Sequence, residues 1–412
     1  MLHLINKIRS HWKKQIASSA HEINVENEIT FSCIDPYIKG KRIILLGESS
    51  HGVGDYQTVK TQLIRYLHEK HGFNVVVLEN GFMETTLGKE MLCEYSKEMQ
   101  IQTACLDIYH TEEMLDLFHD EWAQTLHLTG MDIQSTYPNV SNKILLWLQQ
   151  HTNSSISTNY ERLDKRYFQL EEEIRIKLKK SKRPEVEEVI NEYKQLLIDF
   201  DKLIQENKTE KLPTITAIRR GILNRIQWLQ VCMKGYWSSG ALRSDFMFQN
   251  IEWLLNDYYR GEKIIIWAHN YHIKKAPSMF ESIINMKPVG EALSNKYNND
   301  VYSIGFYAGS GEMATFLRVD LPVVDLKKSY LESLFYKLFS GHLFIDLRST
   351  TISTKKRFMW YNRKWGLLEG GRGPRWVNPQ KVYDAIFFLN EVYSPNYLPL
   401  PDRNLKNVEN NK

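Results

Sequence analysis

The sequence has 412 residues, of which 42% are hydrophobic and 25% are charged, a composition typical of ordinary globular proteins. Its 53 basic and 49 acidic residues leave a formal net charge of +4, an excess too small to imply a nucleic-acid-binding protein. No run of about 18 consecutive apolar residues occurs, which argues against an ordinary membrane-spanning helix.

The cysteines are too widely spaced to suggest a disulfide framework or a zinc site. Cys33, Cys93, Cys105 and Cys232 form no CxxC pair, so we expect reduced thiols in a cytoplasmic protein. Residues 1–14 mix apolar and basic side chains without the unbroken apolar core of a signal peptide, which agrees with that expectation.

The predicted elements form an α/β pattern. Residues 2–19 are expected to form an amphipathic helix, for which packing on the protein body is favoured over membrane attachment. Strand signals follow at 42–46, 74–78, 128–133, 263–267, 300–307, 343–346 and 383–389. Helical periodicity between the first several strands predicts a mostly parallel sheet flanked by helices.

A long charged segment, residues 155–208, interrupts this pattern and is broken once at Pro184. We expect a helical-hairpin insertion whose inner faces are apolar, formed by Leu170, Ile174, Ile176, Val189, Tyr193, Leu196, Leu197 and Phe200. Its charges fit a solvated surface, and a lid over a cleft is the alternative. Residues 1–154 and 209–400 then form a discontinuous catalytic core, and 401–412 a polar tail.

The segment 365–376 is rich in glycine, arginine and tryptophan and is expected to form an ordered loop. Neither GxxxxGK[ST] nor a strand-linked GxGxxG occurs in the chain, so the sequence offers no phosphate-binding fingerprint.

Ionisable residues follow three of the predicted strands. Glu48 and His51 come after the first strand, Glu79 after the second, and His269 and His272 after the strand at 263–267. The carboxyl ends of parallel strands meet at one edge of a sheet, where ligands bind in α/β folds. We therefore expect these five side chains to share one cleft.

This set of residues suits ester hydrolysis. A neutral His51 can take a proton from water as the water attacks a carbonyl, while Glu48 or Glu79 orients the ring and stabilises the imidazolium. His269 and His272 could donate hydrogen bonds to the oxyanion. Taken singly, each residue also has an ordinary role, such as a first-turn acid or a hydrogen-bonded polar side chain.

The chain resembles the erythromycin esterase family over roughly residues 40–390. The resemblance is carried by blocks that occur in the same order, namely Gly47–Gly52, Val77–Glu79, Gly130–Asp132, Arg243–Met247, Trp267–His272, Tyr302–Phe306 and Tyr383–Ala385. The blocks GExxHG and WAHNxH are specific when they occur together. Some members of this family are labelled as linked to succinoglycan biosynthesis.

The resemblance implies an α/β core with a helical insertion, and hydrolysis of a macrolide lactone without a required metal or other cofactor. It makes His51 the general base and Glu79 its carboxylate partner, with Glu48, His269 and His272 as further members of the cleft. Lys60 falls where the esterases carry an arginine. A lysine at this position keeps the positive charge but lacks the two-pronged guanidinium of arginine.

Asp132 and Arg243 are candidate substrate-binding residues, together with Lys60. Arg243 lies in a predicted helix, where its simplest role is an ion pair, but arginine also suits recognition of anionic or carbonyl groups. Asp132 follows a strand, where it could cap a helix or bind substrate hydroxyls.

The favoured function is therefore a metal-independent hydrolase acting on a bulky ester, such as a macrolide, with a small-molecule ester as its partner and a role in antibiotic resistance. The first alternative is a metal-dependent hydrolase that uses the histidines and glutamates as ligands. The second is a noncatalytic binder of carbohydrate or another small molecule, linked to polysaccharide biosynthesis.

Overall fold

The computed structural model describes residues 2–24, 31–135, 139–174, 182–206, 211–234, 236–283, 286–348 and 360–399. The chain divides into two compact units: Met1–Glu79 with Ile251–Pro395, and Asn80–Asn250 with Asn396–Lys412. The predicted tail 401–412, and Ile176 of the predicted hairpin, lie outside the described residues.

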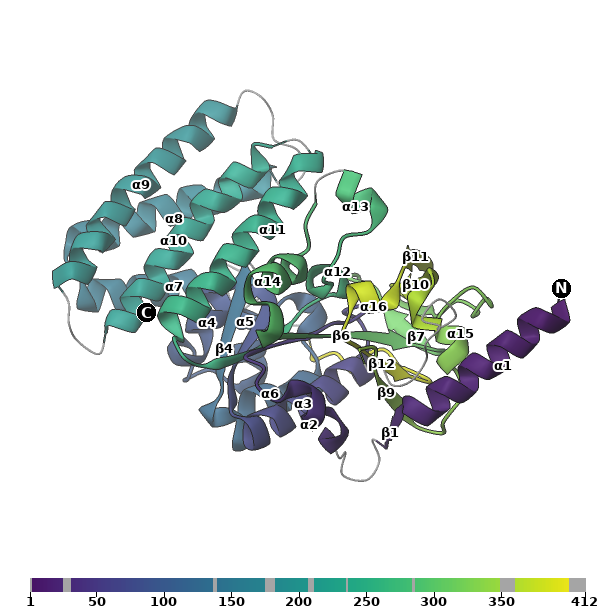
Figure 1. The fold of residues 1–412 in the computed structure, drawn as a ribbon. Helices are drawn as coiled ribbons and strands as arrows, with labels where there is room; N and C mark the ends of the chain where they lie inside the picture. Colours follow the sequence, from purple (N-terminus) through teal and green to yellow (C-terminus); the bar gives the residue numbers. More distant parts are fainter. Residues whose placement is uncertain are drawn as a thin grey trace. The chain divides into compact units, whose positions relative to one another are not determined.

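The first unit is built on a mixed sheet with the strand order β1-β9-β12-β6-β2-β5-β3. Figure 1 labels β1, β6, β9 and β12 of this sheet. The neighbours from β12 to β3 pair in parallel, whereas β9 and β1 add antiparallel strands at one edge. The bounds are β1 His21–Ile23, β2 Ile43–Leu46, β3 Phe73–Gly81, β5 Lys263–Trp267, β6 Val301–Ala308, β9 His342–Asp346 and β12 Ala385–Leu389. The expected mostly parallel sheet is confirmed.

Helices connect and flank these strands. They are α1 Leu2–Ser19, α2 Asp35–Ile38, α3 Gly54–His71, α12 Asn270–Ile273, α13 Met279–Ile283, α14 Val289–Tyr297, α15 Glu332–Phe335 and α16 Pro379–Val382. Helix α3 buries the apolar stripe Tyr56, Val59, Leu63 and Leu67, whose three- and four-residue spacing favours a helix with one buried face. It ends at Gly72, whose φ of 69° is the left-handed conformation that glycine adopts readily.

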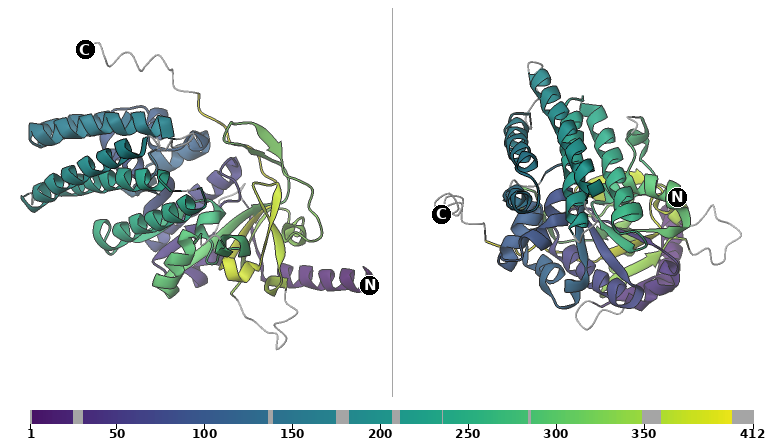
Figure 2. Two further views of the ribbon diagram at one scale, coloured as in Figure 1. Left: turned by 90° about the horizontal axis from the view of Figure 1, so that it is seen from above. Right: turned by 90° about the vertical axis from the view of Figure 1, so that its left-hand side faces the viewer.

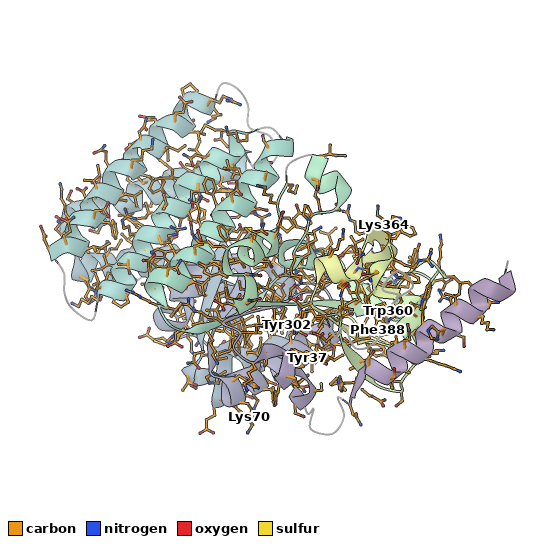
Figure 3. All side chains as sticks on the ribbon, viewed as in Figure 1. Tyr37, Lys70, Tyr302, Trp360, Lys364 and Phe388 are labelled. Atoms are coloured by element: carbon orange, nitrogen blue, oxygen red, sulfur yellow. The ribbon has the colours of Figure 1, made fainter. Side chains whose placement is uncertain are left out.

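The core of the first unit consists of buried strand residues and aromatic rings. All residues of β2 and β12 are buried, as expected for strands covered on both faces. Phe306 and Phe387 stack with ring centroids 4.9 Å apart. The rings of Tyr37 and Tyr302 are nearly parallel, with centroids 6.4 Å apart, and Figure 3 labels both residues. This packing fixes the sheet from which the site residues project.

Two small hairpins complete the first unit. The strands β7 Glu312–Ala314 and β8 Asp320–Pro322 form one, and β10 Trp365–Glu369 and β11 Gly373–Val377 form the other. The expectation of a loop at 365–376 is therefore wrong. Gly370 and Gly371 both have positive φ, which allows the tight reversal that brings the two short strands together.

The second unit is mainly helical. It contains α4 Phe82–Met91, α5 Lys97–Ala104, α6 Leu115–His119, β4 His127–Asp132, α7 Asn139–His151, α8 Ser154–Ile174, α9 Arg183–Glu206, α10 Leu212–Cys232 and most of α11 Tyr236–Trp253. The helices α8, α9 and α10 run side by side (Figure 2). The helices expected within 155–208 are thus α8 and α9, and all the expected inner-face residues that are described are buried.

This unit, from Asn80 to Asn250, is larger than the insertion 155–208 proposed from the sequence. Helix α9 packs on both α8 and α10, so the hairpin belongs to a wider helical assembly. Among the described residues, no helix is long and apolar enough to cross a bilayer.

Candidate active site

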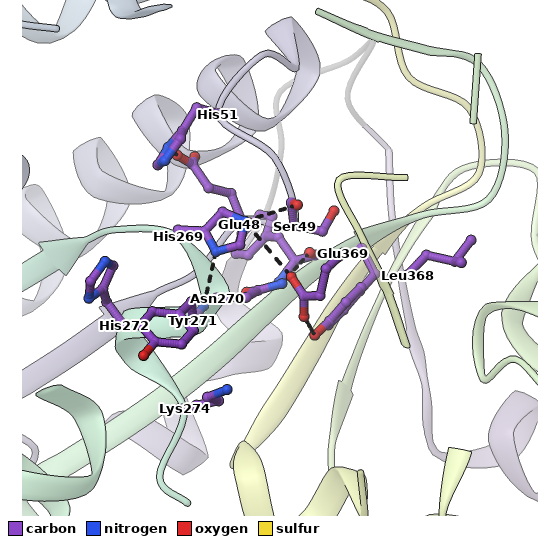
Figure 4. A network of polar contacts seen from close by, with 12 residues as sticks. Glu48, Ser49, His51, His269, Asn270, Tyr271, His272, Lys274, Leu368 and Glu369 are labelled. Carbon is purple, nitrogen blue, oxygen red and sulfur yellow. Dashed lines mark hydrogen bonds and ion pairs between the residues drawn. The ribbon is translucent and has the colours of Figure 1, made fainter. Parts of the chain in front are cut away.

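The carboxyl ends of three adjacent parallel strands carry the candidate site. Glu48 follows β2, His269 follows β5, and Glu79 lies near the end of β3. The backbone N–H groups of Gly47 and Ser49 donate to β6 carbonyl oxygens, so the chain on both sides of Glu48 is held to the sheet. Figure 4 shows the side chains of Glu48, His51, His269 and His272 in one region.

Glu48 is fully buried and accepts hydrogen bonds from three side chains. Its Oε1 lies 2.5 Å from Nδ1 of His51, and its Oε2 accepts from Nε1 of Trp267 at 2.8 Å and from Nζ of Lys60. Burial raises the pKa of the carboxyl group, but Lys60 and His51 outweigh it and lower the pKa to about 2. Glu48 is therefore ionised at neutral pH.

Lys60 lies on α3 and is also fully buried. Burial lowers its pKa to about 8, against the opposing effect of Glu48. Its Nζ lies 4.5 Å from the ring centroid of Trp267 and 5.3 Å from that of Phe306, where aromatic faces stabilise a cation. Lys60 therefore supplies a positive charge beneath the site.

His51 receives its orientation from Glu48. Because Nδ1 faces the Glu48 carboxylate, the neutral ring carries its proton on Nδ1 and its lone pair on Nε2. Burial lowers the pKa of His51, but Glu79 and Glu48 outweigh it, so the pKa is raised above its ordinary value. The ring thus has the tautomer that a general base acting through Nε2 requires.

Glu79 links the histidines. Its Oε1 lies 3.1 Å from Nε2 of His272 and 4.0 Å from Nε2 of His51, and its Oε2 accepts the backbone N–H of His269 at 2.7 Å. Burial raises its pKa, but His272 and His51 outweigh that effect and hold the pKa well below the usual range. The five residues expected to share a cleft are therefore brought together in the first unit.

His269 is held at both ring nitrogens. It is the N-cap of α12, where Nδ1 accepts the backbone N–H of Tyr271 at 3.1 Å. Its Nε2 lies 3.1 Å from the carbonyl oxygen of Ser49 and 3.8 Å from Oε2 of Glu369. Burial and the nearby His51 lower its pKa to about 4, so this ring is neutral near pH 7.

Two residues of this region were missed from the sequence. Trp267 donates to Glu48, and its position next to the AHNxH block was the available signal. Glu369 lies at the end of β10, accepts a hydrogen bond from the hydroxyl of Tyr307 at 3.0 Å, and has a pKa raised to about 7 by burial. No sequence signal connected Glu369 with the histidines, because the β10–β11 hairpin brings it to His269.

Asp132 and Arg243 are brought together in the second unit. Nε of Arg243 donates to Oδ1 of Asp132 at 3.0 Å, and Nη2 donates to Oδ2. This two-pronged pair connects the end of β4 with α11. Their proposed contact with substrate stays a prediction. Within the described part of the chain, no group of three or more His, Cys, Asp or Glu side chains has an arrangement suited to a metal ion.

The family model of erythromycin esterases matches residues 68–392. This chain belongs to the erythromycin esterase family. Relatives include YbfO of Bacillus subtilis (strain 168), which carries a provisional name as a hydrolase and is 25% identical over 94% of this chain and 91% of its own. Erythromycin esterase type II of Escherichia coli is 23% identical over 74% of this chain and 77% of its own. Family membership supports a hydrolase.

Solved structures share this fold. A protein from Bacillus cereus has a TM-score of 0.76 at 20% identity, with 95% of this chain and 99% of that chain covered. A succinoglycan biosynthesis protein has a TM-score of 0.76 at 17% identity, with 95% of this chain and 99% of that chain covered. A mutant of the erythromycin esterase EreC in its open conformation has a TM-score of 0.67 at 17% identity, with 93% of this chain and 100% of that chain covered.

Proposed function

We propose that this protein hydrolyses a carboxylic ester, and that His51 activates the attacking water. The observation that carries the proposal is the contact between Nδ1 of His51 and the buried carboxylate of Glu48. It fixes the tautomer in which Nε2 accepts a proton, and it stabilises the imidazolium that forms. Lys60 keeps Glu48 ionised, so the histidine has a charged partner throughout.

The proposed reaction has two steps. In the first, Nε2 of His51 takes a proton from water as the oxygen attacks the ester carbonyl, which gives a tetrahedral oxyanion. In the second, the carbon–oxygen bond to the alcohol breaks, and the His51 imidazolium returns the proton to the departing alkoxide. The products are a carboxylic acid and an alcohol, or one hydroxy acid where the ester is a lactone ring.

The roles of the other histidines follow from their contacts. The Nε2 of His272 faces Glu79, and the Nε2 of His269 lies next to the Ser49 carbonyl. Either ring can donate a hydrogen bond to the oxyanion only if its Nε2–H leaves its present acceptor and turns to the substrate.

Asp132, Arg243 and Lys60 are proposed to assist substrate binding. Lys60 would act through Glu48 rather than by direct contact.

A macrolide lactone is the proposed substrate class, since relatives of this chain carry the name erythromycin esterase. The test is to incubate the protein with several macrolides and simple esters and to measure the mass gain of one water. We expect His51→Gln to lower kcat by at least about 100-fold, the usual contribution of a general base. His11→Gln, an exposed histidine on α1, is the matched control.

The outcome separates the competing functions. Activity that disappears with a chelator and returns with added metal would support the metal-dependent alternative. Binding of a macrolide or carbohydrate without cleavage of any ester would support the noncatalytic alternative. Cleavage of simple esters but not macrolides would retain the chemistry and reject a role in antibiotic resistance.

A further inference from the structure

The β7–β8 hairpin carries three exposed apolar side chains, one of which, Phe316, lies beside the proposed general base. Between the two strands, Phe316, Leu317 and Val319 are 67%, 85% and 54% exposed. Isolated exposed apolar residues are common, but a contiguous group at a loop tip is a frequent sign of a binding surface. We define these three residues as the apolar tip.

The apolar tip is attached to the catalytic loop. The backbone N–H of Ala314, at the end of β7, donates to the carbonyl oxygen of Gly52 at 2.7 Å, in an antiparallel bridge directly after His51. The Phe316 ring then lies against the His51 ring, with centroids 5.5 Å apart and planes at 61°. A backbone pairing therefore sets the distance between the tip and the base.

The tip has an ordered conformation. The backbone N–H of Thr315 donates to the carbonyl oxygen of Val319 at 2.9 Å, and that of Arg318 donates to the carbonyl oxygen of Thr315 at 2.8 Å. Arg318 has a φ of 57°, a left-handed conformation that costs a non-glycine residue free energy and persists only where neighbouring contacts hold it. The three apolar side chains are thus presented on a formed turn.

We propose that the apolar tip, and Phe316 above all, binds the hydrocarbon part of the substrate and selects esters with long or bulky apolar groups. This inference rests on the proposed function, which puts the ester carbonyl next to His51. Because the Phe316 ring lies beside the His51 ring, an ester carbonyl attacked by water at His51 would have its first attached carbons near Phe316. Burying these carbons against the ring removes apolar surface from water on both partners.

The test measures binding without turnover. Methyl butyl ketone and methyl octyl ketone carry an ester-like carbonyl but cannot be hydrolysed, and each is titrated calorimetrically into the full-length protein. We expect the wild type to bind the octyl ketone more tightly than the butyl ketone. Phe316→Ala should weaken octyl ketone binding about 10-fold and butyl ketone binding about 2-fold, because the longer chain loses more buried surface. Phe316→Leu should give an intermediate loss.

Trp376→Ala is the matched control. Trp376 is likewise a large aromatic residue, 54% exposed, but it lies with Trp12 of α1 at a different groove of the first unit. Equal affinity of the wild type for the two ketones, or equal losses in Phe316→Ala and Trp376→Ala, would overturn the inference. Chain-length-dependent binding through Phe316 in a protein that cleaves no ester would retain the apolar tip as a binding surface for hydrocarbon groups, but it would reject ester selection together with the proposed hydrolase.

Discussion

Glu48 is the residue on which the site geometry depends, because its one buried carboxylate binds three neighbouring side chains. Its Oε2 accepts from Lys60 and Trp267, which leaves Oε1 for His51. A lysine gives a point charge and approaches a single oxygen, whereas an arginine commonly binds both. At this position the lysine is therefore compatible with a carboxylate that also orients a histidine.

The pH dependence of ester hydrolysis should report on His51. The base acts when neutral, and its pKa is raised above 6.5 chiefly by Glu79, so kcat/KM should fall as the pH drops through a value above 6.5. Glu79→Gln removes that negative charge and should move this acid limb to lower pH. Glu22→Gln, an exposed residue of β1, should leave it in place. An acid limb that stays fixed or moves upward in Glu79→Gln would contradict the assignment of His51.

At the scale of elements, close backbone approach holds the catalytic loop in place. Gly52 lies so near Ala314 that a β-carbon there would overlap with the Ala314 carbonyl group. Gly47 similarly leaves room for the buried side chain of Asn270, which binds the backbone of Phe306 in β6. The glycines on both sides of Glu48 and His51 are thus explained by packing between loop, hairpin and α12.

Gly52→Ala should therefore separate the β7–β8 hairpin from the loop that carries His51. We expect a loss of roughly 1–3 kcal/mol in the free energy of unfolding, the usual cost of adding a methyl group where no space exists. Turnover of any hydrolysed ester should fall as well. Gly373→Ala is the control, because a β-carbon at Gly373 meets no atom within 4 Å. Urea unfolding of both variants measures the difference, and equal stabilities would refute the packing argument.

For the molecule as a whole, buried acids with opposite shifts make stability depend on pH. The pKa of Glu48 is lowered to about 2. Its contribution to the stability of the fold is therefore complete above pH 4.5 and is lost as the pH falls towards 2. Burial raises the pKa of Glu332 to about 8, so the folded protein keeps a proton that the unfolded chain releases above pH 4.5. As the pH rises from 4.5 to about 8, Glu332 therefore lowers the free energy of unfolding of the protein.

Glu332→Gln should remove this effect, because glutamine resembles the protonated acid and can still accept the backbone N–H of Leu368. Near pH 4.5 the free energy of unfolding of the variant should be close to that of the wild type. The difference in favour of the variant should then increase up to pH 8, with an upper limit of about 5 kcal/mol. Urea unfolding at several pH values measures this difference. The exposed Glu187 on α9 provides the control Glu187→Gln. A stability difference that is constant with pH would show that Glu332 is ionised in the folded protein.

The sequence by itself determined the parallel strands of the first unit's sheet and the ionisable residues at the carboxyl ends of three of them. Continuous apolar runs such as Ile43–Leu46 have few alternatives to a buried strand, and parallel strands must bring Glu48, Glu79 and His269 to the same edge. Local spacing was also sufficient for α8 and α9, since their apolar stripes recur at helical intervals.

Only the tertiary structure decided which side chains pair. The two hairpins were not recognised, because strands of three to five residues with exposed positions carry little periodic signal. These hairpins bring Phe316 to His51 and Glu369 to His269. The pairing of Lys60 with Glu48, and the pKa values of both, likewise depend on burial and distance, which folding creates between residues that lie apart in the chain.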